Sequence, residues 1–173
     1  MSSIILIGFM GAGKTTTGTL LAEMTGLPFA DTDQLIEQRA GMSISGIFAE
    51  QGEEAFRKQE TELLLALLKE KQEQILSCGG GLPLREENRA LLKQLGTVIY
   101  LSVQPETVQK RLKGDTTRPL LQGEDAEEKI RTLLGKREDL YEAAADIVIP
   151  VDALTPEEAA EQICRAAAKK MKK

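Results

Sequence analysis

The chain has 173 residues and a formal net charge of −5, which argues against general nucleic-acid binding, because that function usually needs a basic face. Hydrophobic residues make up 42% of the chain, enough for a core, but aromatic residues make up only 3% and tryptophan is absent, which disfavours a base-stacking surface. Histidine is also absent and the two cysteines, Cys78 and Cys164, lie far apart, so we expect no zinc site and a reducing, cytoplasmic setting.

Strand-like and helix-like segments alternate along the chain. Short apolar runs predict strands, and glycines directly after helical patterns, such as Gly26 and Gly41, predict helix ends. In chain order, the predicted elements are a strand over 4–7, a helix over 14–24, a strand over 28–30, helices over 32–40, 43–49 and 53–71, a strand over 74–77, a helix over 85–95, a strand over 97–101, helices over 105–112 and 125–143, a strand over 147–151, and a helix over 156–170 that Thr155 caps.

Five strands separated by helices predict an α/β fold with three layers, in which a five-stranded parallel sheet carries helices on both faces. No repeat or linker divides the sequence, so residues 1–173 are expected to form a single domain. No apolar run approaches the roughly 18 residues of a membrane span. The one long segment without a predicted element, KGDTTRPLLQG from residue 113, has the length of a lid.

The first motif, GFMGAGKT over 8–15, fits G-x-x-x-x-G-K-[ST] and has the required strand before it and helix after it. Its glycines let backbone amides converge on an anion, and the helix N-terminus adds partial positive charge. Lys14 can reach the terminal phosphates of a nucleotide, and Thr15 can offer its hydroxyl to Mg²⁺. The loop alone does not distinguish a kinase from a switch or a motor.

Two carboxylates follow the second predicted strand, in the sequence ADTDQL. Asp31 and Gln34 have the spacing of a capping box, so Asp31 has a structural interpretation as a helix cap. Ligands of open parallel sheets bind at the carboxyl ends of the strands, however, and both Asp31 and Asp33 lie there. One carboxylate can serve a metal shell while the other orients an attacking hydroxyl.

Further polar and glycine-rich segments each have a structural and a functional interpretation. Arg57 and Glu60, three residues apart on one helix, form either a surface ion pair or part of a site. The run 79–81, three glycines after a strand, is either a flexible turn or a place where backbone meets a ligand closely. Arg137 is either part of an exposed charge network or a ligand group, and Arg118 in the lid segment is placed to close over phosphate.

Taken together, these segments resemble the shikimate kinase family, which has the nucleoside-monophosphate-kinase-like P-loop fold. The resemblance spans roughly residues 3 to 165 and is carried by ILIGFMGAGKTT, FADTDQLIEQRAGMSISGIFAEQGEEAFRKQE, LSCGGG, TTRPLL and KREDLYEAAAD, in that order. It implies a single P-loop kinase domain with an acceptor-binding part at about 32–60 and a short lid at about 112–124. It also implies phosphorylation of the 3-hydroxyl of shikimate by ATP, in the cytoplasm and by a monomer, without nucleic-acid or membrane partners.

The resemblance also assigns roles to individual residues. It implies Lys14, Asp33 and Arg118 as catalytic residues, with Asp33 as the candidate base, and Mg²⁺ held by Thr15 and by Asp31 through water. Glu60 would orient Arg57. The ATP-binding residues implied are Gly11, Ala12, Gly13, Lys14, Thr15, Thr16, Arg111, Arg118 and Asp152. The shikimate-binding residues implied are Asp33, Arg57, Gly79, Gly80, Gly81 and Arg137.

The residues alone leave two alternatives to this function open. A related small-metabolite kinase, such as a gluconate kinase, would need a different acceptor pocket, whereas Arg57 and Arg137 favour a carboxylated acceptor. A non-catalytic nucleotide-binding regulator would keep the phosphate loop but would need neither an acceptor pocket nor the lid arginine, Arg118.

Overall fold

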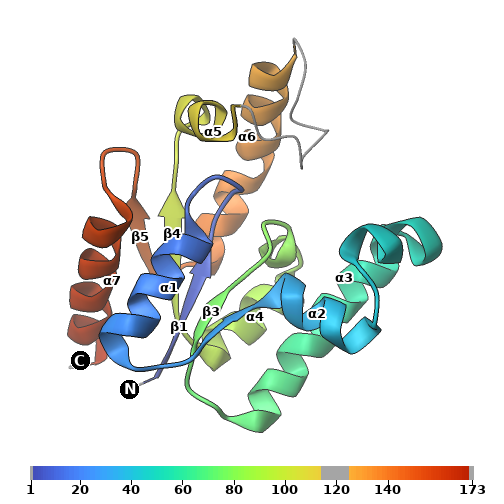
Figure 1. Cartoon of the computed structure of the whole chain (residues 1–173), viewed down its shortest axis with the longest axis horizontal. Helices are drawn as coiled ribbons and strands as arrows, with labels where there is room; N and C mark the ends of the chain where they lie inside the picture. The colour runs from blue at the N-terminus through green and yellow to red at the C-terminus, as the bar shows by residue number, and fades with distance from the viewer. Residues whose placement is uncertain (1, 114–124, 172–173) are drawn as a thin grey trace.

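The computed structural model describes residues 2–113 and 125–171. Within these residues, five strands form one parallel sheet in the order β2-β3-β1-β4-β5 (Figure 1). The strands are β1 (Ser3–Ile7), β2 (Phe29–Asp31), β3 (Ile75–Ser77), β4 (Gly96–Ser102) and β5 (Ile147–Pro150). The helices are α1 (Lys14–Thr25), α2 (Thr32–Ala40), α3 (Ile44–Glu70), the short 3₁₀ helix η1 (Leu82–Leu84), α4 (Glu86–Leu95), α5 (Pro105–Leu112), α6 (Ala126–Ala144) and α7 (Pro156–Met171).

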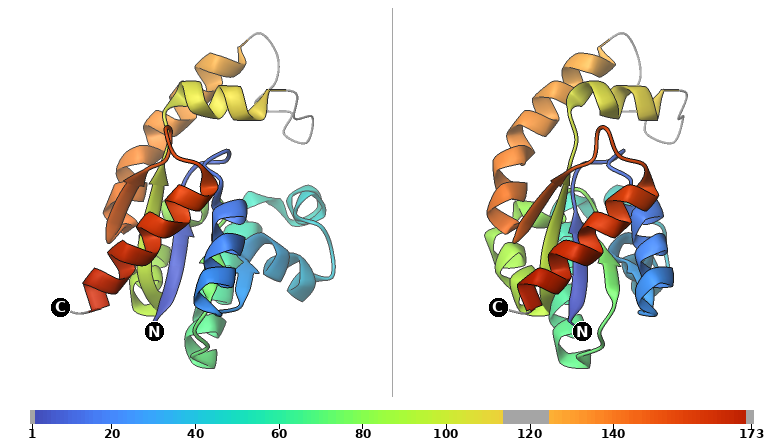
Figure 2. Two further views of the ribbon diagram at one scale, coloured as in Figure 1. Left: turned by 60° about the vertical axis from the view of Figure 1, so that its left-hand side comes forward. Right: turned by 90° about the vertical axis from the view of Figure 1, so that its left-hand side faces the viewer.

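Helices cover both faces of the sheet. Helices α1 and α7 pack together on one face, whereas α4 and α6 cover the other and α3 packs against α4 (Figure 2). Strands β1 and β4 at the centre are therefore buried on both sides, which explains why SIILI and TVIYL are almost continuously apolar. The predicted three-layer α/β fold is confirmed.

The register of the parallel strands brings three functional segments to one edge of the sheet. Ser77 at the end of β3 pairs with Leu6 of β1 on one side and with Asp31 of β2 on the other. The chain therefore leaves the sheet at the same level to form the phosphate loop after β1, helix α2 after Asp31, and the glycine run after β3. This is the edge at which open α/β sheets bind ligands.

The predicted elements differ from the structure mainly at their ends. The break expected between the helices over 43–49 and 53–71 is present: α3 is divided by a kink at Gly52, whose φ of 87° and ψ of 171° are not helical. Helix η1 after the glycine run was not predicted. Thr155 caps α7 as expected: its Oγ1 accepts from the Glu158 amide at 3.1 Å, and the Glu158 carboxylate accepts from the Thr155 amide at 3.1 Å. None of the helices described is both long and apolar enough to cross a membrane.

Candidate functional site

The phosphate loop has the shape of an anion site. Gly11 and Gly13 adopt φ values of 83° and 85°, which side chains other than glycine rarely allow. Gly13 is the N-cap of α1 and contributes no side chain, so the first amides of the helix face the cavity in front of the loop. The Lys14 Nζ donates to the carbonyl oxygens of Gly8 at 2.8 Å and Phe9 at 3.0 Å, which holds the ammonium group over the loop.

Asp31 and Asp33 lie beside this loop but differ in environment. Asp31 is the helix cap that its spacing suggested, because its Oδ1 accepts from the amides of Asp33 at 2.9 Å and Gln34 at 3.2 Å. Both bonds use one carboxylate oxygen, and Asp31 also lines the cavity. Burial, assisted by the negative charge of Asp31, raises the pKa of Asp33 above its ordinary value, whereas Lys14 and Arg57 act in the opposite direction. Asp33 is thus a more basic carboxylate than a solvated one.

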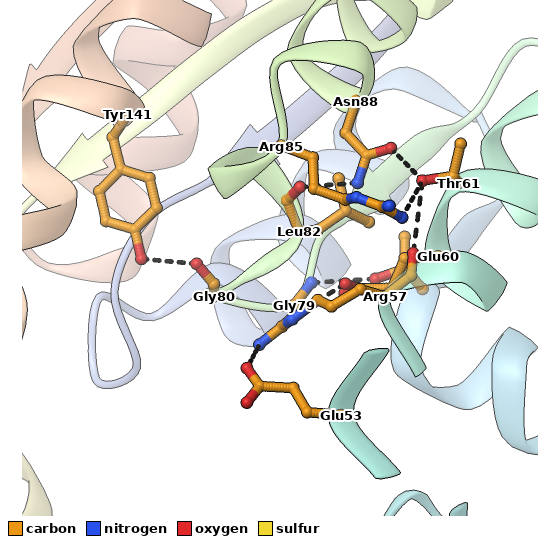
Figure 3. A network of polar contacts seen from close by, with 11 residues as sticks. Glu53, Arg57, Glu60, Thr61, Gly79, Gly80, Leu82, Arg85, Asn88 and Tyr141 are labelled. Atoms are coloured by element: carbon orange, nitrogen blue, oxygen red, sulfur yellow. Dashed lines mark hydrogen bonds and ion pairs between the residues drawn. The ribbon is translucent and has the colours of Figure 1, made fainter. Parts of the chain in front are cut away.

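Arg57, which is half-buried, forms an ion pair with the fully buried Glu60, so their interpretation as a surface pair is wrong. Arg57 Nη1 lies 2.8 Å from Glu60 Oε1, and the side chains are only 16% and 1% exposed (Figure 3). The guanidinium also approaches Glu53 at 3.6 Å. The Oε2 atom of Glu60 is buried without a hydrogen-bond partner among the described residues. Burial raises the pKa of Glu60 to about 7, although the hydrogen bond and charge of Arg57 act to lower it.

The raised pKa of Glu60 predicts how the stability of the folded protein changes with pH. The pKa of Glu60 is higher in the folded state, about 7, than its ordinary value of 4.5, so the folded protein binds more protons than the unfolded chain between these values. The wild type should therefore lose stability as pH rises through this window. Glu60→Gln imitates the protonated form, and its free energy of unfolding should exceed that of the wild type by on the order of 1–3 kcal/mol above the window, with the difference vanishing as pH falls below the ordinary value of 4.5.

Urea unfolding at a series of pH values measures this difference. The control is Glu62→Gln, which changes an exposed glutamate of the same helix. Its stability should follow the wild type at every pH. A constant difference between Glu60→Gln and the wild type across the window would contradict a raised pKa for Glu60.

The glycine run 79–81 lies directly against three of the predicted site residues. A Cβ atom added to Gly79 would be 2.7 Å from Asp33 Oδ1, and one added to Gly80 would be 3.3 Å from Arg137 Nη1. At Gly81 the added atom would collide with both terminal nitrogens of Arg57. The run is therefore a surface on which backbone and functional side chains meet closely, as the functional interpretation required.

Hydrogen bonds from three other elements fix this run in place. The Gly79 amide donates to Thr32 Oγ1 at 2.9 Å, the Tyr141 hydroxyl donates to the Gly80 carbonyl at 2.7 Å, and Asn88 Nδ2 donates to the Leu82 carbonyl at 2.9 Å (Figure 3). These bonds argue against a flexible turn. Sequence reasoning missed Thr32, Asn88 and Tyr141 as parts of the site, and only Tyr141 carried a signal, because it follows Arg137 by four residues on one helix.

Arg137 faces the site rather than a network of exposed charges. Its guanidinium carbon lies 5.9 Å from the centre of the Phe9 ring, and its side chain lines the cavity. Arg137 forms no ion pair with Glu138 or Asp139, so that interpretation is wrong. Its Nε is buried and has no hydrogen-bond partner in the part of the chain that the structure describes. A half-buried, incompletely bonded cation of this kind suits an anionic ligand.

One cavity of about 440 Å³ joins nearly all of these groups. Its lining includes Gly11, Gly13, Lys14, Thr15, Thr16, Asp31, Asp33, Arg57, Glu60, Gly79, Gly80, Gly81 and Arg137. A cation-rich end formed by the two arginines and a phosphate-loop end therefore share one space, with Asp33 lining the same wall. Two anionic molecules can meet there, each with its own positive groups.

A second cavity, of about 320 Å³, lies on the other side of the phosphate loop, between the loop and the start of α7. It contains the predicted residues Ala12 and Arg111, and Arg111 donates to the Gly11 carbonyl at 2.9 Å and to the Val151 carbonyl at 3.3 Å. Asp152 lines neither cavity; its Oδ1 accepts from the Gln104 amide at 2.8 Å. The predicted lid residue Arg118 lies outside the described residues.

Comparisons with known proteins find matches over nearly the whole chain. Residues 10–168 match a family model described as shikimate kinase. The chain is 47% identical over 165 residues to the shikimate kinase of Thermodesulfovibrio yellowstonii, covering 95% of this chain and 94% of that relative. A solved structure of shikimate kinase from Acinetobacter baumannii in complex with shikimate has a TM-score of 0.89 at 39% identity, covering 98% of this chain and 94% of that one. A gluconokinase from Sinorhizobium meliloti, with a TM-score of 0.56 at 16% identity and coverage of 98% and 95%, shares the fold alone.

Proposed function

Since this chain belongs to the shikimate kinase family, we propose that it transfers the terminal phosphoryl group of ATP to the 3-hydroxyl of shikimate, which gives shikimate 3-phosphate and ADP. The observation that carries this proposal is that Arg57 and Arg137 line the same cavity as Lys14 and Asp33. They come from different helices and lie against neighbouring glycines. Two arginines beyond the phosphate loop are unnecessary for nucleotide binding but suit the carboxylate of a second substrate.

In this proposal each group has a distinct task. Arg57 and Arg137 bind the carboxylate of shikimate, and the backbone of Gly79, Gly80 and Gly81, with Asp33, binds its hydroxyls. The oxygen of the 3-hydroxyl attacks the γ-phosphorus, the bond from that phosphorus to the bridging oxygen of ADP breaks, and Asp33 accepts the hydroxyl proton. Lys14 neutralises charge on the transferred group, and Arg118 of the predicted lid segment is assigned the same task.

Thr15 and Asp31 suit a magnesium ion that is shared with ATP. Both line the large cavity, and they offer a hydroxyl and a carboxylate, the oxygen ligands that Mg²⁺ prefers. Among the described residues, no group of three or more acidic or cysteine side chains could hold a metal by itself. That fits an ion held by one or two protein groups together with phosphate oxygens, which would polarise the transferred phosphoryl group.

Two further parts of the proposal concern the oligomeric state of the protein and its location in the cell. We propose that it acts as a monomer, because one chain supplies the lining of both cavities. We also propose the cytoplasm as its location, since Cys78 and Cys164 are unpaired, as expected in a reducing compartment.

The direct test is ADP release from ATP and Mg²⁺, with shikimate, gluconate or no acceptor, followed by identification of the product. Turnover that depends on shikimate and on Mg²⁺ and gives the 3-phosphate supports the proposal. Gluconate-dependent turnover would instead favour the other metabolite kinase. ADP release that no acceptor changes, or the absence of turnover, would favour a nucleotide-binding regulator.

Replacing Arg57 by alanine tests the acceptor pocket. We expect the KM for shikimate to rise at least about thirtyfold, because a buried, charge-assisted contact is lost, while the KM for ATP stays within about twofold. Steady-state kinetics with each substrate varied in turn measures both values. The control is Arg131→Ala, which removes an exposed arginine of α6 paired with Glu106 and Glu127 and should change neither KM. Equal losses for both substrates would remove Arg57 from the acceptor pocket.

A further inference from the structure

The hydroxyl of Tyr141 lies where the glycine run meets helix α6. The side chain is fully buried, and its ring packs against the ring of Tyr100, with centroids 5.1 Å apart. Figure 3 shows the hydroxyl directed at the carbonyl of Gly80. Packing accounts for the two rings, but it does not require a polar atom at this place.

The Tyr141 hydroxyl connects two groups of the acceptor pocket. It donates its single proton to the Gly80 carbonyl at 2.7 Å, and the Arg137 guanidinium lies beside the same glycine. A Cβ atom built on Gly80 would be 3.3 Å from Arg137 Nη1 and 3.6 Å from the Tyr141 oxygen. The guanidinium and the hydroxyl therefore both lie against the same glycine.

Arg137 has fewer polar partners than Arg57 among the described residues. Arg57 is held by Glu60 at 2.8 Å and Glu53 at 3.6 Å, whereas no carboxylate pairs with Arg137 within the described ranges. The Nε of Arg137 is buried without a partner. A long side chain with so few polar contacts keeps several rotamers unless a neighbour selects one. The Tyr141 hydroxyl is in place to do so.

We propose that Tyr141 is a positioning residue for acceptor binding. Its hydroxyl holds Gly80 and the Arg137 guanidinium at one fixed spacing, so that backbone and cation bind the same substrate molecule together. The inference rests on the proposed function, because it assigns Arg137 to the acceptor carboxylate. Burial raises the pKa of Tyr141 despite the opposing charge of Arg137, so the hydroxyl keeps its proton at neutral pH.

The test compares two chemically identical substitutions in the same buried ring pair. Tyr141→Phe removes the hydroxyl at Gly80, whereas Tyr100→Phe removes one that forms no hydrogen bond to the glycine run. We expect Tyr141→Phe to raise the KM for shikimate about tenfold while the KM for ATP stays within about twofold. Tyr100→Phe should leave both values within about twofold. Melting temperatures of both variants separate a loss of stability from a loss of positioning.

A double-mutant cycle tests whether Tyr141 acts through Arg137. If it does, Tyr141→Phe added to Arg137→Ala should raise the KM for shikimate less than about twofold further. The role is overturned if Tyr141→Phe behaves like Tyr100→Phe, or if its effect is the same with and without Arg137. A wild type that releases no ADP in response to shikimate would instead refute the proposed function, and this inference with it.

Discussion

Replacing Lys14 by methionine should lower kcat by about a thousandfold or more while the fold remains intact. The ammonium group lies over the phosphate loop, held by the Gly8 and Phe9 carbonyls, and the side chain lines the large cavity. Methionine has a similar length and no charge. It therefore keeps the shape of the loop but cannot neutralise charge on the transferred phosphoryl group.

Initial rates of shikimate-dependent ADP release at saturating substrates measure this loss, and circular dichroism checks the fold. The matched control is Lys93→Met, which changes an exposed lysine in the last turn of α4. It should retain wild-type activity. Wild-type turnover by Lys14→Met would remove the phosphate-binding role of the loop.

The second large effect is expected from Asp33→Asn, which should lower kcat by about two to three orders of magnitude. Asparagine keeps the size of aspartate and can still hydrogen-bond a substrate hydroxyl, so the KM for shikimate should change much less than kcat. What it loses is the ability to accept a proton. The first turn of α2 should persist, because the cap is supplied by Asp31.

The pH dependence of kcat adds an independent check on Asp33. Transfer requires its carboxylate form, so activity should fall as pH drops through the pKa of Asp33, which burial places above the ordinary value of 3.8. Asp33→Asn should lack this acid limb. Asp139→Asn, at an exposed position of α6, should keep both the rate and the limb. An unchanged kcat for Asp33→Asn would exclude Asp33 as the base.

Much of this site was predictable because several of its functional residues belong to short motifs of consecutive residues. The phosphate loop combines its glycines, Lys14 and Thr15 within eight consecutive residues, and the strand and helix around it follow from hydrophobic periodicity. The placement of Asp31 and the glycine run at the same edge follows from the parallel sheet alone. The structure confirms this arrangement through the pairing of Ser77 with Leu6 and Asp31.

The features that sequence reasoning missed depend on contacts between distant segments. The spacing of Arg57 and Glu60 is the same for an exposed pair and for a buried one, so burial could be established only by the packing of α3. Tyr141 and Gly80 are 61 residues apart, and Asn88 is bonded to Thr61 of another helix. Asp152 was assigned to ATP by a loose match to the family's adenine pocket; its Oδ1 accepts from the Gln104 amide, and its role in ATP binding stays a prediction.

The close approach of Gly79, Gly80 and Gly81 to their neighbours also bears on drug resistance. An inhibitor bound to bare main chain at these positions would contact groups that, except for a change to proline, a point mutation does not remove. A resistant enzyme would have to add a side chain there, and that side chain would displace Asp33, Arg137 or Arg57. Resistance of this kind would therefore impair the enzyme itself, which makes this strip of backbone a more durable inhibitor target than any single side chain.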